Sequence, residues 1–286
     1  MVWLFLSSLI SAFSIPVNKN LFGSLNPFLI STVFCLSSAV FFLPFFRRQH
    51  LGIPDLCKIF LIGAVQFGLM YSLFQASFFF LQGHEVALLL ITTPAYVAAI
   101  GNIFSKNLDR RRTAMAVVVG ISVLFLTDFS QKFYFKWQGI LLTQGCNFSF
   151  AIGQVLIKRF CERRNIENLF PLNAPLYAGA AVVCLPLVFL SGKHFPCSPA
   201  SGHAIASAAL FGIICCGICH WLWNTGAVKT QIHTLAAMNN LQIPMAVIIS
   251  CTIFSEKIDP KRLFCSCIFL AAICLVSTGG KQRNST

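Results

Sequence analysis

The sequence predicts an all-α, polytopic membrane protein in which ten transmembrane helices form two inverted five-helix repeats. Three observations lead to this fold class: an apolar composition, a series of long apolar segments and an internal repeat. Of the 286 residues, 57% are hydrophobic and 10% are charged, and the mean hydropathy is +0.77. A soluble domain carries about 25% charged residues because water must wet its surface. We therefore expect the chain to lie in a lipid bilayer.

Ten apolar segments, each bounded by charged residues, proline or glycine, are long enough to cross a bilayer. In chain order they lie near residues 2–18, 26–46, 58–80, 86–104, 113–129, 137–157, 172–190, 203–223, 233–254 and 262–278. The first segment has no cationic leader and no small-residue cleavage site, so we expect a retained helix rather than a signal peptide. The short connections leave no room for a soluble domain.

The net charge of +13 comes from short basic clusters between the apolar segments, such as Arg47–Arg48 and Arg110–Arg112. These residues do not line one amphipathic face, which argues against a nucleic-acid partner. If the N-terminus is inside, the inner loops and tail hold fourteen Lys and Arg residues and the outer loops hold seven. Because basic residues concentrate on the cytoplasmic side, we expect both termini in the cytoplasm and a multi-pass protein of the cell inner membrane.

The repeat appears where two apolar segments end in similar sequences, FSKNLDRRR from Phe104 and FSEKIDPKR from Phe254. Aligned at an offset of 150, residues 87–112 and 237–262 share eight of 26 positions without a gap. We interpret this as a duplication of five spans, with one repeat over residues 1–130 and the other over 131–286. An odd number of spans inverts the second copy, an architecture typical of alternating-access carriers.

The repeat pairs two prolines, Pro94 with Pro244. A proline within a helix removes a backbone donor, and proline is common in membrane helices in general. Because these two occupy equivalent positions, we predict that they are hinges.

Polar side chains within apolar spans are costly unless they are paired or wetted, so they are the candidate substrate-binding residues. The alternative for each is a hydrogen bond to a neighbouring helix, which we favour for the isolated Gln66 and Gln144. The predicted substrate-binding residues are Tyr71, Gln75, Tyr96, Asn147, His220, Trp223, Asn224, Asn239, Asn240 and Gln242.

Two clusters among them stand out. In HWLWN, Trp223 and Asn224 follow His220 by three and four residues and share its helix face. The indoles could stack on a planar or cationic ligand, or they could form an interfacial aromatic belt. In AAMNNLQIP, three carboxamides precede Pro244, which favours a site because they are expensive at mid-membrane depth.

Other functional classes lack their usual residues. No Asp or Glu lies deep in a span, which favours exchange or facilitated movement over a carboxylate-driven proton symport. His220 and His233 have no carboxylate partner for an enzyme, and neither a ring of charges nor a carbonyl filter indicates a channel. Most of the thirteen cysteines lie in apolar runs as packed thiols. We predict no catalytic residues, no metal site and no cofactor.

The chain resembles the ten-span EamA-type members of the drug/metabolite transporter superfamily. The resemblance rests on WLFLSSLISAFSIPVNK, on the repeated proline span followed by FSEKID, and on GILLTQGCNFSFAIGQVLIKR. Glu256 matches a glutamate usual in this family, whereas the equivalent residue of the first repeat is Lys106. The resemblance implies two inverted five-helix repeats and the movement of small metabolites across the membrane.

Within that superfamily the small, basic, Cys- and Phe-rich chain is similar to the S-adenosylmethionine/S-adenosylhomocysteine exchangers of obligate intracellular bacteria. This similarity implies uptake of S-adenosylmethionine in exchange for S-adenosylhomocysteine. The alternative within the superfamily is an exporter of amino acids or other metabolites.

Overall fold

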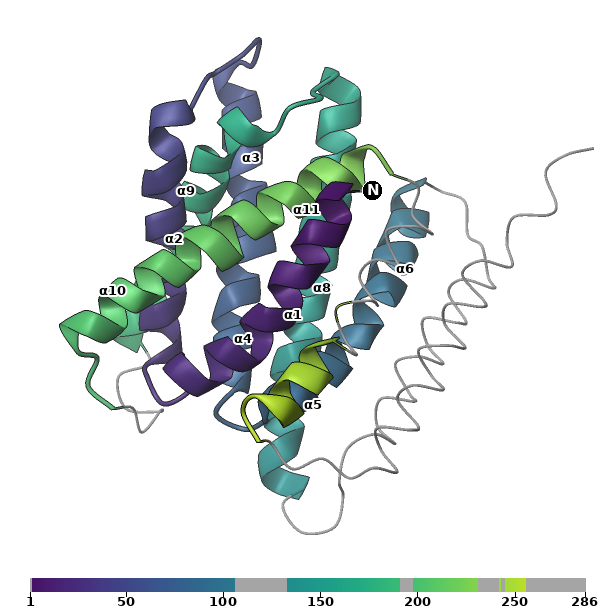
Figure 1. Ribbon diagram of the computed structural model, residues 1–286. Helices are drawn as coiled ribbons and strands as arrows, with labels where there is room; N and C mark the ends of the chain where they lie inside the picture. Colours follow the sequence, from purple (N-terminus) through teal and green to yellow (C-terminus); the bar gives the residue numbers. More distant parts are fainter. Residues whose placement is uncertain (1, 106–132, 191–197, 231–241, 243–244, 256–286) are drawn as a thin grey trace, which may run out of the picture.

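A computed structural model describes residues 2–105, 133–190, 198–230, 242 and 245–255 (Figure 1). Within these ranges all regular secondary structure is helical, and seven segments are long and apolar enough to cross a membrane. They are Val2–Phe22, Pro27–Phe45, Ile53–Ser77, Gly83–Gly101, Lys136–Arg164, Phe170–Leu190 and Gly202–Val228. The all-α, polytopic fold is confirmed.

These seven segments correspond to seven of the ten predicted spans. The predicted spans 113–129 and 262–278 lie outside the described residues, and 233–254 is described only at Gln242 and from residue 245 onward. The number ten therefore stays a prediction.

Some of the spans are single helices and others are composite. The helices and short turns, in chain order, are α1 (Val2–Phe22), α2 (Pro27–Phe42), η1 (Leu43–Phe45), α3 (Ile53–Gly63), η2 (Ala64–Leu69), α4 (Met70–Ser77), α5 (Gly83–Leu89), η3 (Leu90–Thr92), α6 (Thr93–Ser105), α8 (Phe133–Arg164), η4 (Phe170–Leu172), α9 (Asn173–Leu190), α10 (Gly202–Phe211), η5 (Gly212–Ile218) and α11 (Cys219–Val228).

Several helices begin where the sequence supplies a cap. The Asn26 side chain accepts hydrogen bonds from the first amides of α2, directly before Pro27. The Ser201 side chain does the same for α10, and Gln82 and Glu85 form a capping box at α5. These side chains satisfy amides that have no partner within the helix. Proline at the first helical position has the backbone angle that a helix requires.

The segments η2 and η5 are π-helices, each in the middle of a long span. A π-helix widens the turn by one residue and rotates the side chains that follow, and such turns are frequent at functional sites. The two π-helices lie at nearly equivalent positions of the sequence repeat, since Ala64 and Leu69 correspond to residues 214 and 219. The residues that begin α4 and α11 are therefore placed by the same local distortion.

The centre of the bundle is the contact between α2 and α9, the most extensive between any two described elements. Next to it, α9 packs on η2 and α2 packs on η5, so each central helix touches a π-helix that is distant in the sequence. Figure 1 shows the long α10–α11 segment crossing the bundle, with α1 beside α11. The aromatic rings of Phe67 and Tyr177 stack at 4.6 Å in this core.

Glycines allow the close approach of α3 and α9. A Cβ on Gly63 would collide with the backbone carbonyl of Leu176, and a Cβ on Gly179 would collide with that of Phe60. Small residues at helix interfaces in membranes let backbones approach and gain dispersion contacts. The two glycines therefore fix the distance between these helices.

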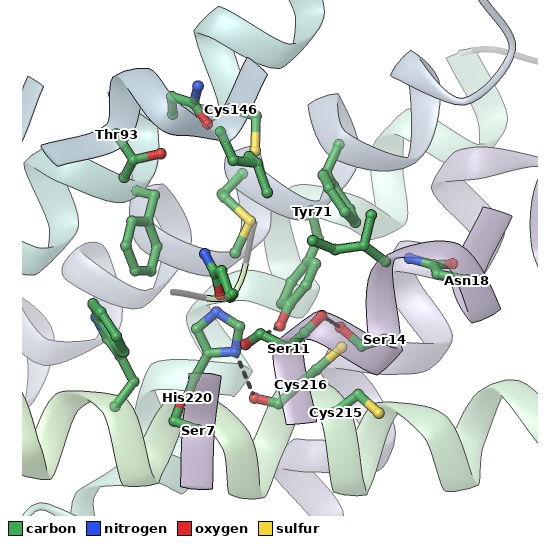
Figure 2. A pocket seen from close by; sticks show the side chains of 18 of the residues that line it. Ser7, Ser11, Ser14, Asn18, Tyr71, Thr93, Cys146, Cys215, Cys216 and His220 are labelled. Atoms are coloured by element: carbon green, nitrogen blue, oxygen red, sulfur yellow. Dashed lines mark hydrogen bonds between the residues drawn. The ribbon is translucent and has the colours of Figure 1, made fainter. Parts of the chain in front are cut away.

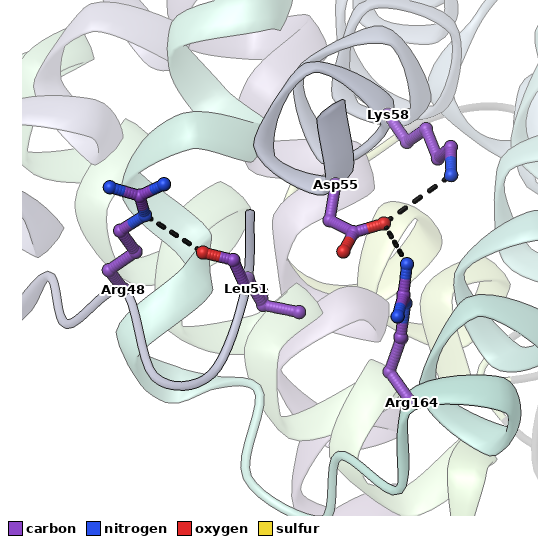
Figure 3. A network of polar contacts seen from close by, with 5 residues as sticks. All are labelled: Arg48, Leu51, Asp55, Lys58 and Arg164. Atoms are coloured by element: carbon purple, nitrogen blue, oxygen red, sulfur yellow. Dashed lines mark hydrogen bonds and ion pairs between the residues drawn. The ribbon is translucent and has the colours of Figure 1, made fainter. Parts of the chain in front are cut away.

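Ion pairs join α8 to other helices at both of its ends. At one end Arg164 binds the Asp55 carboxylate at 2.7 Å, and Lys58 contacts the same oxygen at 3.3 Å (Figure 3). At the other end Lys136 binds Glu85 of α5 at 2.7 Å. Lys136 and Arg164 are separated by about 40 Å at 1.5 Å per residue, the full depth of a membrane with its interfaces.

Candidate functional site

A cavity with a volume of about 100 Å³ lies within the bundle. It is lined by residues of α1, α4, η3, α6, α8, α10, η5 and α11 and by Gln242. Small-ligand pockets are concave and mostly apolar, with a few polar groups that orient the ligand, and this lining has that composition. The cavity is thus a candidate binding site for a small molecule.

One wall is a polar stripe on α1. Ser7, Ser11, Ser14 and Asn18 all line the cavity, and their spacing of four, three and four residues places them on one helix face. The Ser7 hydroxyl donates to the Cys219 carbonyl at 2.9 Å, and Ser14 donates to the Ser11 carbonyl at 2.9 Å. This stripe presents hydroxyl and amide groups to the interior.

Beside this stripe, Tyr71 of α4 and His220 of α11 meet. The Tyr71 hydroxyl and His220 Nδ1 are 3.0 Å apart, and the same nitrogen lies 3.1 Å from the Cys216 carbonyl oxygen. Figure 2 shows the Tyr71 and His220 side chains directed toward one another, with Ser7 and Ser11 nearby. Edge contacts from Phe67 and Phe150 hold the imidazole ring.

A third polar wall comes from α8. Asn147 lines the cavity, and its amide donates to the Leu89 carbonyl at 3.0 Å and to the Thr92 hydroxyl at 2.8 Å. Thr92 in turn donates to Gln144 Oε1 at 2.8 Å, so Gln144 makes the interhelical bond that the sequence suggested for it. These bonds tie α8 to the turn η3 that precedes Pro94.

Five of the ten predicted substrate-binding residues line the cavity. They are Tyr71, Asn147, His220, Trp223 and Gln242. Asn239 and Asn240 lie outside the described residues, as does the predicted hinge Pro244. The other predicted hinge, Pro94, is the second residue of α6 and follows the 3-10 turn η3, so the span changes its helical form beside it.

Three predicted residues do not line the cavity. Gln75 is buried and donates to Asn18 Oδ1 at 3.0 Å, so it supports a lining residue from behind. Tyr96 packs against Phe148 at 5.9 Å. Asn224 is fully buried and accepts from Gln66 Nε2 at 3.1 Å, so its amide joins α11 to the η2 segment.

The serine stripe of α1 was not among the predicted residues. Single serines are common in membrane helices, and none of the three attracts notice alone. Their spacing with Asn18 over residues 7–18 is the signal that could have identified this face.

The described lining of the cavity is uncharged: it contains no Asp, Glu, Lys or Arg. Its polar groups are hydroxyls, amides, an imidazole and an indole, among aromatic and aliphatic side chains. Within the described residues no group of three or more His, Cys, Asp or Glu side chains could hold a metal ion. The lining therefore suits a ligand that binds through neutral hydrogen bonds and apolar contacts.

Comparison with known proteins adds the family. The sequence model of the EamA-like transporter family matches residues 1–128 and 137–278. A biotin transporter of Escherichia coli is 29% identical over 263 residues, covering 90% of this chain and 86% of that protein. The biotin transporter of Salmonella typhimurium is 28% identical over the same length. A probable biotin transporter of Pseudomonas aeruginosa is 26% identical over 278 residues, with 93% of each chain covered.

A crystal structure shares the fold. It superposes with a TM-score of 0.70 at 14% sequence identity and covers 99% of this chain and 98% of the other. At this identity the likeness concerns the fold alone.

Proposed function

The chain belongs to the EamA-like transporter family, and we propose that it carries biotin across the bacterial inner membrane by alternating access. As a family member it is a multi-pass membrane transporter of small metabolites. The identity of the substrate, the hinges and the residues that bind the substrate are our proposal.

The observation that carries the proposal is the uncharged, hydrogen-bonding cavity. Biotin has a rigid bicyclic body whose ureido group offers one carbonyl acceptor and two N–H donors, together with a thioether and an aliphatic chain. The hydroxyls of α1 and the Asn147 amide can pair with the ureido group, while Phe74 and Phe150 offer apolar surface. Neutral polar groups that leave water need such partners. The names of the relatives independently favour the same substrate.

S-adenosylmethionine is the second candidate. The aromatic rings around His220 suit a planar base such as adenine. Its sulfonium and ammonium groups, however, are cations, and the described lining has no carboxylate to pair with them. Biotin also carries one charge, the carboxylate at the end of its aliphatic chain, so it has fewer charged groups to bury than S-adenosylmethionine but is not neutral. The names of the relatives make biotin the preferred substrate.

Alternating access rests on the two proposed five-helix repeats, residues 1–130 and 131–286. The reciprocal packing of α9 on η2 and of α2 on η5 supports this division, as do the two π-helices. The cavity takes its lining from both repeats. A site between inverted repeats can open to either side as one repeat rocks against the other. Cytoplasmic termini remain part of the proposal.

Uptake of radiolabelled biotin tests the proposal. The chain is expressed in a bacterial biotin auxotroph that lacks its own biotin carrier, and uptake is compared with that of cells carrying the empty vector. We expect saturable uptake that excess unlabelled biotin abolishes and S-adenosylmethionine does not. Uptake of S-adenosylmethionine without uptake of biotin would overturn the substrate assignment.

A further inference from the structure

Trp223 contributes a buried hydrogen-bond donor that has no acceptor among the described residues. Its side chain is 5% exposed and lines the cavity, and its Nε1 is fully buried. An indole N–H can only donate. Buried polar groups in folded proteins are nearly always paired, so an exception in a cavity indicates a place for a ligand acceptor.

The surroundings of Trp223 hold the indole in place. Its ring packs against Leu4, Ala227 and Phe150. A Cβ on Gly226 would collide with the Leu4 side chain, which shows how closely α1 approaches α11 here. A donor whose ring is fixed by packing loses little conformational entropy when a ligand binds. The donor is therefore pre-organised.

We propose that Trp223 Nε1 donates a hydrogen bond to a neutral carbonyl oxygen of the transported molecule. On the proposed function, that oxygen is the ureido carbonyl of biotin. The carboxylate of biotin is the less suitable acceptor, because the described lining has no cation to compensate for a buried charge. Trp223 is thus a specificity-determining residue that selects substrates with a carbonyl acceptor on a compact ring.

The test compares Trp223 with a second tryptophan that lies outside the cavity. Trp221 also has a buried Nε1 without an acceptor among the described residues, but it packs on Phe170 at 4.9 Å and does not line the cavity. Trp223→Phe and Trp221→Phe each remove the indole donor and keep an aromatic ring. Uptake of radiolabelled biotin is measured for both variants and for the unaltered chain, with membrane abundance as a control.

Three unlabelled competitors identify the acceptor. Biotin methyl ester keeps the ureido carbonyl and loses the carboxylate charge, whereas 2-iminobiotin replaces the ureido oxygen by nitrogen. We expect Trp223→Phe to weaken competition by biotin and by its methyl ester about tenfold, which is the effect of losing one well-placed hydrogen bond. Competition by 2-iminobiotin should be equal in the two proteins, or absent from both. Trp221→Phe should change none of these values.

Each contrary outcome is distinct. The proposed role of Trp223 would be overturned if Trp223→Phe weakened competition by all three compounds equally, or if it weakened competition by none of them. Biotin transport itself would stand in either case. Weakening of biotin but not of its methyl ester would overturn the assignment to the ureido carbonyl. Absence of biotin uptake by the unaltered chain would instead remove the proposed function. If Trp223→Phe does not reach the membrane, 3-benzothienylalanine at position 223 replaces N–H by sulfur at nearly constant shape and takes its place.

Discussion

Tyr71 and His220 are joined by a 3.0 Å hydrogen bond across the cavity, and each is the second residue after a π-helix. Tyr71 follows η2 and His220 follows η5, so the two π-helices place these side chains next to one another. At the offset of 150 the two residues differ by one position from exact equivalence, since Tyr71 corresponds to Trp221. The pair therefore links the proposed repeats at the place where we put the substrate.

Replacing Tyr71 by Phe should impair transport rather than folding. The variant removes the hydroxyl that contacts His220 Nδ1 and keeps the ring. Because His220 lines the cavity, loss of the bond that holds its imidazole should weaken substrate binding by about the value of one neutral hydrogen bond, 0.5–1.5 kcal/mol. We therefore expect KM for biotin to rise by about three- to tenfold. Initial uptake rates over a range of biotin concentrations measure it.

Tyr177→Phe is the matched control for Tyr71→Phe. Tyr177 is also buried and its hydroxyl donates to the Cys216 carbonyl, but it does not line the cavity. We expect lower thermal stability with unchanged KM for biotin. The same rise of KM in both variants would contradict the placement of the substrate beside Tyr71.

Asn224→Ala should lower stability without changing substrate affinity. Asn224 accepts a hydrogen bond from Gln66 away from the cavity, and its removal leaves Gln66 Nε2 unpaired in a buried position. A buried donor without a partner costs about 1–3 kcal/mol. Thermal unfolding in detergent should show the loss, and KM of the folded protein should equal that of the unaltered chain. A raised KM with unchanged unfolding temperature would restore Asn224 to the site.

Gly179→Ala should strongly destabilise the bundle. The added methyl group would collide with the Phe60 carbonyl oxygen where α9 crosses α3. Overpacking of this kind costs about 1–3 kcal/mol or more. Gly101→Ala is the control, since its Cβ would meet no atom of the described residues within 4 Å. Unfolding temperatures in detergent compare the two, and equal values would mean that α3 and α9 do not approach as closely as described.

The two ion pairs of α8 should act on opposite sides of the membrane. Glu85→Gln removes the partner of Lys136, and Asp55→Asn removes the partner of Arg164. Each pair restrains one end of α8, so each variant should loosen only the end of α8 at which its ion pair is lost. Hydrogen exchange followed by mass spectrometry should show faster exchange near Glu85 in the first variant and near Asp55 in the second. Faster exchange at both ends in either variant would show that the pairs do not act separately.

The fold was largely predictable because lipid imposes simple requirements on a sequence. A span needs about 20 apolar residues, and the seven described spans match seven of the predicted segments, with ends that differ by at most seven residues. The π-helices were not predicted, because apolar periodicity does not distinguish the two helix types over six or seven residues. Both π-helices follow segments that contain glycine, but glycine is too common in membrane helices to identify a π-helix.

The candidate site was predictable only in part. Large or strongly polar residues such as His220 and Trp223 were selected because their burial demands a reason, and they line the cavity. Asn224 was selected for its spacing from His220, but that spacing takes no account of the neighbour Gln66, whose side chain donates a hydrogen bond to the Asn224 amide. The serines of α1 were missed because each is inexpensive to bury and meaningful only as a set.

The most direct test of the account is counterflow with the purified protein in liposomes. Vesicles loaded with unlabelled biotin are diluted into radiolabelled biotin, so that accumulation of label requires a carrier that binds biotin on both sides of the membrane. We predict that the unaltered chain causes transient accumulation of labelled biotin. Its KM for biotin should be about tenfold lower than that of Trp223→Phe. The proposed biotin transport would be contradicted if these vesicles accumulated no more labelled biotin than protein-free vesicles, while vesicles loaded with S-adenosylhomocysteine did accumulate labelled S-adenosylmethionine.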